Sequence, residues 1–173
     1  MIAQLKSLII DVEDFPKPGI VFKDFTPLLA DSRGLALAVE LMANPYRTQD
    51  VDVVVGAESR GFIFGTAVAQ ALSAGFVPIR KKGKLPRATA RIEYALEYGT
   101  DCLEIHADAL RPGQRVLIVD DLLATGGTLA AASALVGGLG AHVVGLTVLI
   151  EITNLNGRKR LAGLGDVHAV LTY

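Results

Sequence analysis

Apolar and polar residues follow one another in blocks that predict buried strands alternating with amphipathic helices. Short runs rich in Val and Ile are typical of strands buried on both faces, as in a parallel sheet covered by helices. These runs span residues 51–56, 75–80, 115–119, 143–150 and 167–171. Apolar residues at helical spacing predict helices over residues 1–12, 62–72 and 129–139. A helix capped by Asp31 or Ser32 is expected over residues 32–46, and a short one around residues 157–161. The alternation predicts an α/β fold with a doubly wound, mainly parallel sheet flanked by helices.

The strand over residues 115–119 is expected to stop at two adjacent carboxylates, Asp120 and Asp121. A small, glycine-rich loop follows and leads into a helix; it consists of Ala124, Thr125, Gly126, Gly127 and Thr128. Free backbone N–H groups and the helix dipole favour an anion at such a place, and glycine allows it a close approach. The loop therefore predicts a phosphate site, although it matches neither a P-loop nor a dinucleotide fingerprint. The alternative is a solvated strand end followed by a plain Gly/Thr turn.

Basic side chains follow two other predicted strands, at the strand ends where ligands bind in open α/β sheets. The planar guanidinium of Arg60 suits a diphosphate, and an ion pair with Glu58 is the alternative. Residues 81–87 concentrate positive charge in a chain whose charges otherwise balance. They indicate either a bound polyanion or an ordinary solvated face.

Two segments combine apolar residues with features that prevent regular helices. Residues 14–27 contain three prolines and a glycine, which predict an extended arm with fixed turns. This arm is either a binding wall or an apolar segment packed on the core or on a partner subunit. Residues 88–99 alternate polar and apolar side chains, as in a mobile hairpin or lid, and residues 94–101 offer aromatic rings and a carboxylate to close over a planar substrate.

Composition excludes several classes of protein. A chain of 173 residues with a net charge of -1 fits one domain without a nucleic-acid or polybasic membrane surface. The single cysteine excludes an internal disulfide and fits a reducing compartment, and the three histidines lack the spacing of a zinc site. We expect no secretory signal peptide. Residues 122–150 carry no charged side chain, but their glycines and polar residues predict a buried helix, turn and strand rather than a membrane span.

Several blocks of the chain, taken together, resemble the adenine phosphoribosyltransferases, which belong to the type I phosphoribosyltransferases. The blocks are residues 15–24, 58–62, 80–86, 96–99 and 119–128. The acid pair with its Thr-Gly-Gly-Thr loop resembles the signature for phosphoribosyl pyrophosphate (PRPP), which is shared by the wider superfamily. The proline-rich arm and the Leu-Glu-Tyr-Gly block, residues 96–99, point to adenine.

The resemblance implies a single type I phosphoribosyltransferase domain over residues 1–173, with a base-binding arm at about 12–28 and a lid at about 81–101. It implies transfer of the 5-phosphoribosyl group from PRPP to adenine, giving AMP and diphosphate in purine salvage. It also implies Mg²⁺, held mainly through substrate and water without a dedicated protein ligand, and a cytoplasmic homodimer. Neither nucleic acid nor a membrane is expected as a partner.

The resemblance also implies a role for each matching residue. The phosphate of PRPP or AMP would bind Ala124, Thr125, Gly126, Gly127 and Thr128, and the ribose hydroxyls or the Mg²⁺ shell would face Asp120 and Asp121. The diphosphate would bind Ser59, Arg60, Lys81 and Lys84. The base would contact Val21, Phe22 and Lys23, while Glu97 manages a proton on the purine and Tyr98 closes the site. The resemblance therefore implies that the catalytic residues are Glu97, Tyr98 and Arg60. At Lys23 the chain departs from the family, which usually has an arginine at this position.

Two alternatives remain open from the sequence. The first keeps the reaction but uses hypoxanthine, guanine or another purine; the arm and lid residues favour adenine. The second is a regulator that binds PRPP or a nucleotide without turnover. Such a regulator is expected to lack the lid carboxylate or to add a nucleic-acid surface, and this chain has Glu97 and no basic excess.

Overall fold

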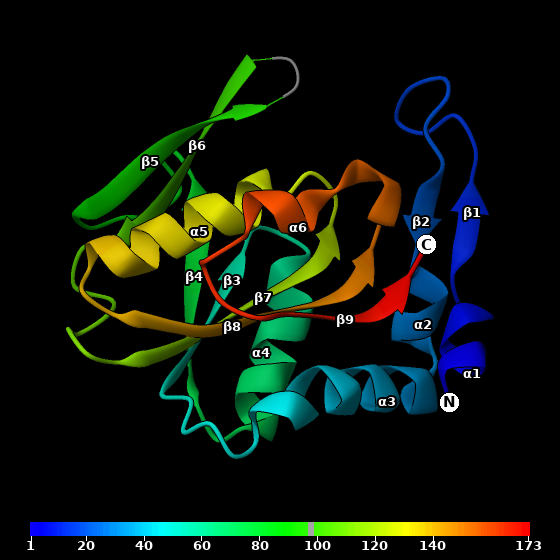
Figure 1. Cartoon of the computed structure of the whole chain (residues 1–173), viewed down its shortest axis with the longest axis horizontal. Helices are drawn as coiled ribbons and strands as arrows, with labels where there is room; N and C mark the ends of the chain where they lie inside the picture. Colours follow the sequence, from blue (N-terminus) through cyan, green and yellow to red (C-terminus); the bar gives the residue numbers. More distant parts are fainter. Residues whose placement is uncertain (97–98) are drawn as a thin grey trace.

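A central sheet organises the molecule (Figure 1). The computed structural model describes residues 1–96 and 99–173, and within them seven strands form one sheet in the order β5-β6-β4-β3-β7-β8-β9. The strands are β3 (Val53–Ala57), β4 (Gly75–Lys81), β5 (Thr89–Leu96), β6 (Gly99–His106), β7 (Arg115–Leu123), β8 (His142–Glu151) and β9 (Val167–Thr172). Strands β4, β3, β7, β8 and β9 are parallel, and β6 and β5 are antiparallel at one edge. The predicted doubly wound, mainly parallel sheet is confirmed.

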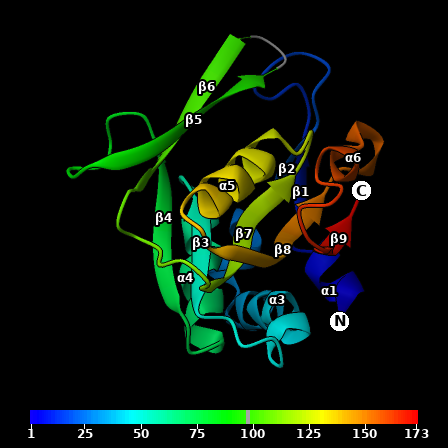
Figure 2. The ribbon, with the colours of Figure 1, turned by 60° about the vertical axis from the view of Figure 1, so that its left-hand side comes forward.

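Helices cover both faces of the sheet, so its central strands are buried on both sides. The helices α3 (Ser32–Ala43) and α4 (Gly61–Ala71) pack on one face, and α5 (Gly127–Gly138) packs on the other (Figure 2). Along β7, Ile118 points into the core under α5, whereas Leu117 joins the core under α3 and α4. This alternation explains why the strand sequences are continuously apolar. None of the helices in the described ranges is long and apolar enough to cross a bilayer.

Local signals in the sequence set the ends of the longer helices. The carboxylate of Asp31 accepts a hydrogen bond from the Gly34 backbone N–H at 2.6 Å, which caps the first turn of α3. Helix α3 ends before Asn44-Pro45, and a 3₁₀ turn, η1 (Asn44–Tyr46), completes the predicted helical segment. A second 3₁₀ turn, η2 (Thr153–Leu155), precedes the short helix α6 (Gly157–Arg160).

The prediction of one helix over residues 1–12 is wrong. The helix α1 spans only Ile2–Lys6, and a strand β1 (Ile10–Val12) follows, paired antiparallel with β2 (Phe22–Asp24) of the arm. The segment 9–12 holds three β-branched residues, which favour a strand when a neighbouring strand offers pairing. The arm then enters the helix α2 (Thr26–Ala30), so it is less extended than expected.

The expectation that the strand before the acid pair stops at residue 119 is also wrong. Strand β7 continues through both aspartates to Leu123, because β8 runs alongside and pairs Leu122 with Ile150 and Leu123 with Glu151. The acid pair therefore lies inside the sheet, where its neighbours fix it more firmly than a loop would. As a result, both carboxyl groups are buried.

The predicted hairpin is present as β5 and β6, which pair from Thr89 with His106 to Leu96 with Gly99. The hairpin and the β1–β2 arm both extend beyond the sheet on the same side of the molecule (Figure 1, Figure 2). The space between them lies above the ends of the parallel strands.

Candidate active site

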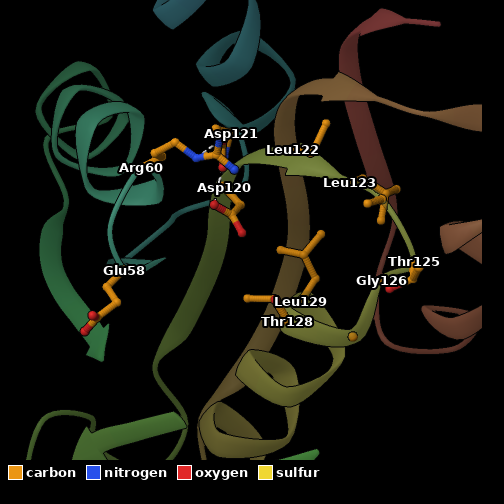
Figure 3. Close-up of a pocket in the computed structure, with 12 residues that line it drawn as sticks. Glu58, Arg60, Asp120, Asp121, Leu122, Leu123, Thr125, Gly126, Thr128 and Leu129 are labelled. Atoms are coloured by element: carbon orange, nitrogen blue, oxygen red, sulfur yellow. Dashed lines mark hydrogen bonds and ion pairs between the residues drawn. The ribbon is translucent and has the colours of Figure 1, made fainter. Parts of the chain in front are cut away.

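A cleft of about 200 Å³ lies at the carboxyl ends of β3 and β7 (Figure 3). It is lined by Glu58, Arg60, Asp120, Asp121, Leu122, Leu123, Ala124, Thr125, Gly126, Gly127, Thr128 and Leu129. The chain enters helices on opposite faces of the sheet after these two strands, which is the position where open α/β sheets bind ligands. The structure therefore brings the predicted acid pair, the predicted phosphate loop and Arg60 together in one cleft.

The glycine-rich loop presents the free N-terminus of α5 to this cleft. Gly126 occupies the N-cap position in the left-handed region, with φ of +82°, which glycine adopts without a steric penalty. Among the described residues no side chain caps this helix, so the N–H groups of its first turn have no side-chain acceptor. Uncapped N–H groups at the positive end of a twelve-residue helix favour an anion.

The two carboxylates of the acid pair are buried but lie in different environments. The side chain of Asp121 forms an ion pair with Arg60, with 3.0 Å between the carboxylate oxygen and Nε. The Asp121 backbone N–H donates a hydrogen bond to Oδ1 of Asp120 at 2.9 Å. Burial raises the pKa of Asp120 well above its ordinary value, and the nearby Asp121 carboxylate raises it further. The cleft thus places a carboxylate that has Arg60 as its counterion beside one whose pKa is raised by burial.

Arg60 connects the acid pair to the arm. Its guanidinium carbon lies 5.3 Å from the centre of the Phe22 ring and 6.0 Å from that of Phe25. The alternative ion pair between Arg60 and Glu58 does not form. Instead, the Glu58 carboxylate accepts hydrogen bonds from Arg80 Nε at 3.1 Å and from the Lys81 backbone N–H at 2.8 Å. Arg60 is therefore the basic side chain that reaches the cleft from the start of α4.

The remaining predicted diphosphate residues surround the cleft without lining it. Ser59 is exposed, and the peptide bond joining it to Glu58 is cis. Lys81 is exposed at the end of β4 and forms an ion pair with Asp101 at 3.3 Å. Lys84 is exposed in the turn after β4.

The arm brings one of its three predicted base-contacting residues next to the cleft. The Phe22 ring packs edge-on against Phe15, with 5.2 Å between ring centres, and its other neighbour is Arg60. Val21 is exposed. The Lys23 ammonium donates to both carboxylate oxygens of Asp11, at 2.7 and 2.8 Å, and lies 4.4 Å from the centre of the Tyr173 ring. Lys23 is thus held by β1 and by the C-terminal residue.

The predicted catalytic residues Glu97 and Tyr98 lie outside the described residues. Their roles remain predictions that rest on the family resemblance.

Sequence reasoning assigned no chemistry to residues 151–173, yet α6 from this segment adjoins the phosphate loop. A methyl group built on Gly157 would lie 2.3 Å from the Ala124 carbonyl oxygen, and Arg160 lies beside Gly127. Tyr94 of β5 lies next to Gly127 on the side where Arg160 lies. Burial raises the pKa of the Tyr94 phenol, and a hydrogen bond with Thr128 partly offsets this increase. The three consecutive basic residues at 158–160 could have indicated an anion-binding role for this segment. Surface loops commonly carry such basic runs, so the pattern by itself does not distinguish a binding site.

In the part of the chain that the structure describes, no group of three or more His, Cys, Asp or Glu side chains is arranged to hold a metal ion. Three carboxylates line the cleft: Asp121 pairs with Arg60, Glu58 accepts hydrogen bonds from Arg80 and the Lys81 backbone, and Asp120 lies next to Asp121. This donor set fits a cation that keeps most of its water and bonds chiefly to its substrate.

The chain is similar to known proteins over almost its whole length. Residues 27–164 match the model of the phosphoribosyl transferase domain. The adenine phosphoribosyltransferase of Clostridium perfringens is 58% identical, and the match covers 98% of each chain. That of Paracoccus denitrificans is 56% identical and covers 98% of this chain and 91% of the relative.

Solved structures agree with these sequence relatives. The adenine phosphoribosyltransferase of Rhodothermus marinus superposes with a TM-score of 0.95 at 53% identity, covering 99% of this chain and 98% of the other. The Saccharomyces cerevisiae enzyme, in complex with D-2,5-dideoxy-2,5-imino-altritol 1,6-bisphosphate and adenine, has a TM-score of 0.92 at 37% identity, covering 98% and 97%. The chain therefore belongs to the phosphoribosyl transferase domain family and, within it, to the adenine phosphoribosyltransferases.

Proposed function

We propose that the cleft transfers the 5-phosphoribosyl group of PRPP to adenine and releases AMP and diphosphate. The observation that carries this proposal is the uncapped glycine N-terminus of α5 beside a buried acid pair and Arg60 in a single cleft. The complex of the yeast relative with a sugar bisphosphate and adenine supports one site for both substrates. In the transfer, the bond from the anomeric carbon to the diphosphate oxygen breaks, and a bond to a purine nitrogen forms.

The loop from Ala124 to Thr128 would hold the 5'-phosphate of PRPP through backbone N–H groups and hydroxyls. Asp120 and Asp121 would accept hydrogen bonds from the two ribose hydroxyls. Because Asp120 tends to keep its proton in the unliganded cleft, a hydroxyl donor from the sugar would favour its ionised form. These contacts would place the anomeric carbon above the ends of β3 and β7.

Arg60 would stabilise the negative charge that gathers on the departing diphosphate. Its present partner is Asp121, so its planar guanidinium would exchange one anionic partner for another. Ser59, Lys81 and Lys84 would complete the diphosphate site from the two adjacent turns. Lys81 is the exposed partner of its ion pair with Asp101, so water competes for its ammonium and opening of the pair costs about 1 kcal/mol.

The arm would bind adenine through the Phe22 ring and the Val21 backbone, and Lys23 would adjoin the base. Glu97 would manage the purine proton as a general acid or base, and Tyr98 would exclude water as the lid closes. The position of Phe22 against Arg60 supports a base site directly beside the diphosphate site.

We also propose that Mg²⁺ accompanies PRPP, with Asp120 and Asp121 accepting hydrogen bonds from its water ligands. When bound, the ion would neutralise charge on the diphosphate. We further propose a cytoplasmic homodimer that acts in purine salvage. Exposed apolar side chains on the arm and on the adjacent strand β1, namely Phe15, Ile20 and Ile10, support contact with a second subunit. The free thiol of Cys102 is compatible with a reducing compartment.

Replacement of Glu97 by Gln tests the reaction together with the lid residue. We expect Glu97→Gln to lower kcat by about 10²- to 10⁴-fold, since a general acid or base contributes a factor of this size. PRPP affinity, measured by calorimetry, is expected to change less than threefold because the phosphate loop is untouched. Loss of PRPP binding in this variant would contradict the role assigned to Glu97.

A further inference from the structure

Helix α6 is held directly against the phosphate loop by two glycines. A methyl group built on Gly157 would lie 2.3 Å from the Ala124 carbonyl oxygen, and one built on Gly126 would lie 2.6 Å from the Gly157 carbonyl oxygen. Neither position has room for a side chain, so the two backbones are in contact. The close approach fixes where α6 lies relative to α5 (Figure 1).

That last residue, Arg160, extends over the first residues of α5. Its Cβ lies 3.4 Å from the point that a methyl group on Gly126 would occupy, and its Nη1 lies 3.2 Å from the corresponding point on Gly127. The guanidinium therefore lies beside the uncapped N–H groups of the helix, at the positive end of its dipole. A cation is unfavourable there unless an anion lies between the two groups.

Arg160 has no ion-pair partner among the described residues. Its neighbour Arg158 is different, because it donates three hydrogen bonds to the Glu151 carboxylate, at 2.7 to 3.0 Å, and one to the Val167 carbonyl oxygen. Arg158 thus connects α6 to the sheet, while Arg160 is left with its guanidinium beside the loop. The same short helix contains one structural arginine and one without an anionic partner.

We propose that Arg160 binds the 5'-phosphate of PRPP and of AMP, opposite the backbone N–H groups of the loop. This inference rests on the proposed function, because it assigns the partner of a phosphate already placed in that loop. The planar guanidinium donates two parallel hydrogen bonds to phosphate oxygens, and the incoming anion removes the repulsion between Arg160 and the helix dipole. Arg160 is a binding residue rather than a participant in bond making.

The test compares Arg160→Gln with the native chain and with Lys159→Gln, which removes a neighbouring exposed cation from the same helix. Calorimetric titration with AMP and with ribose 5-phosphate is expected to show about tenfold or greater loss of affinity in Arg160→Gln. The KM for PRPP is expected to rise similarly, while the KM for adenine changes less than twofold. Lys159→Gln is expected to bind both ligands like the native chain, and Arg160→Lys to recover part of the affinity.

Unchanged affinity of Arg160→Gln for both phosphates would overturn the proposal. An equal loss in Lys159→Gln would also overturn it, since the effect would then come from overall charge. The binding assays use no turnover, so they separate this inference from the proposed function. A native chain that binds ribose 5-phosphate through Arg160 but does not transfer the phosphoribosyl group of PRPP to adenine would sustain the inference and contradict the function.

Discussion

Two identical side chains at adjacent positions of β7 have different electrostatic roles. Asp121 has Arg60 as a counterion, whereas Asp120 is buried next to the Asp121 carboxylate and accepts its backbone N–H. A methyl group built on Gly61 would lie 2.8 Å from Oδ1 of Asp120, so this glycine leaves room for the carboxylate. Burial of Asp120 beside a second carboxylate therefore destabilises its ionised form in the folded protein.

That destabilisation predicts a pH-dependent effect of Asp120→Asn. The raised pKa means that the folded state holds the Asp120 proton more tightly than the unfolded chain, whose pKa is about 3.9. Ionisation therefore destabilises the fold as the pH rises from about 4 towards the raised pKa. The neutral amide avoids this loss, so Asp120→Asn is expected to be more stable than the native chain at pH 7, by a margin that shrinks as the pH falls.

Urea unfolding of Asp120→Asn and the native chain between pH 5 and 8 measures this difference in stability. The activity of Asp120→Asn is expected to fall, because the proposed contact with a ribose hydroxyl is weakened. The matched control is Asp121→Asn, which leaves Arg60 without its partner and is expected to lower stability at pH 7. Two results would contradict the environments assigned to Asp120 and Asp121. In one, Asp120→Asn is no more stable than the native chain at pH 7; in the other, its advantage in unfolding free energy grows as the pH falls.

Among the elements of the fold, α6 is in direct backbone contact with the glycine-rich loop that we propose binds phosphate. Gly157→Ala places a methyl group 2.3 Å from the Ala124 carbonyl oxygen. We expect a loss of about 1–3 kcal/mol in unfolding free energy and a clear rise in the KM for PRPP, because the loop must shift. Gly137→Ala is the control: Gly137 lies in the last turn of α5 with open space around it, so alanine there is expected to leave stability unchanged or to raise it by less than about 1 kcal/mol. An unchanged KM in Gly157→Ala would show that the loop tolerates the shift.

The arm depends on the last residue of the chain for its position. The Tyr173 ring lies 4.4 Å from the Lys23 ammonium and 5.0 Å from that of Lys6, which connects β2 and α1 to the end of β9. We expect Tyr173→Leu to raise the KM for adenine about two- to fivefold, since each such contact contributes about 0.5–1 kcal/mol. The KM for PRPP is expected to stay the same.

Tyr173→Phe separates the ring from its hydroxyl. The buried hydroxyl has no hydrogen-bond partner within the described ranges, so phenylalanine is expected to preserve both KM values. If Tyr173→Phe raised the KM for adenine as much as Tyr173→Leu, the contact between the ring and Lys23 would not be what positions the arm.

At the scale of the molecule, the parallel sheet brings distant segments to one edge. The sequence predicted the central strands and the acid pair with its loop, because buried parallel strands and glycine-rich turns have strong local patterns. Short elements were less predictable: residues 9–12 become a strand only because the arm pairs with them. The partner of Arg60 and the place of Arg160 depend on contacts between segments far apart in sequence, which local patterns do not encode.

We propose that this one cleft joins a phosphoribosyl group to adenine. The most direct measurement is release of AMP and diphosphate from PRPP and Mg²⁺, with adenine, hypoxanthine, guanine and xanthine offered separately. We predict equal amounts of AMP and diphosphate with adenine and no nucleotide from the other three bases. Turnover with an oxopurine in place of adenine would contradict the assigned base, and PRPP binding without turnover on any base would contradict the enzymatic function itself.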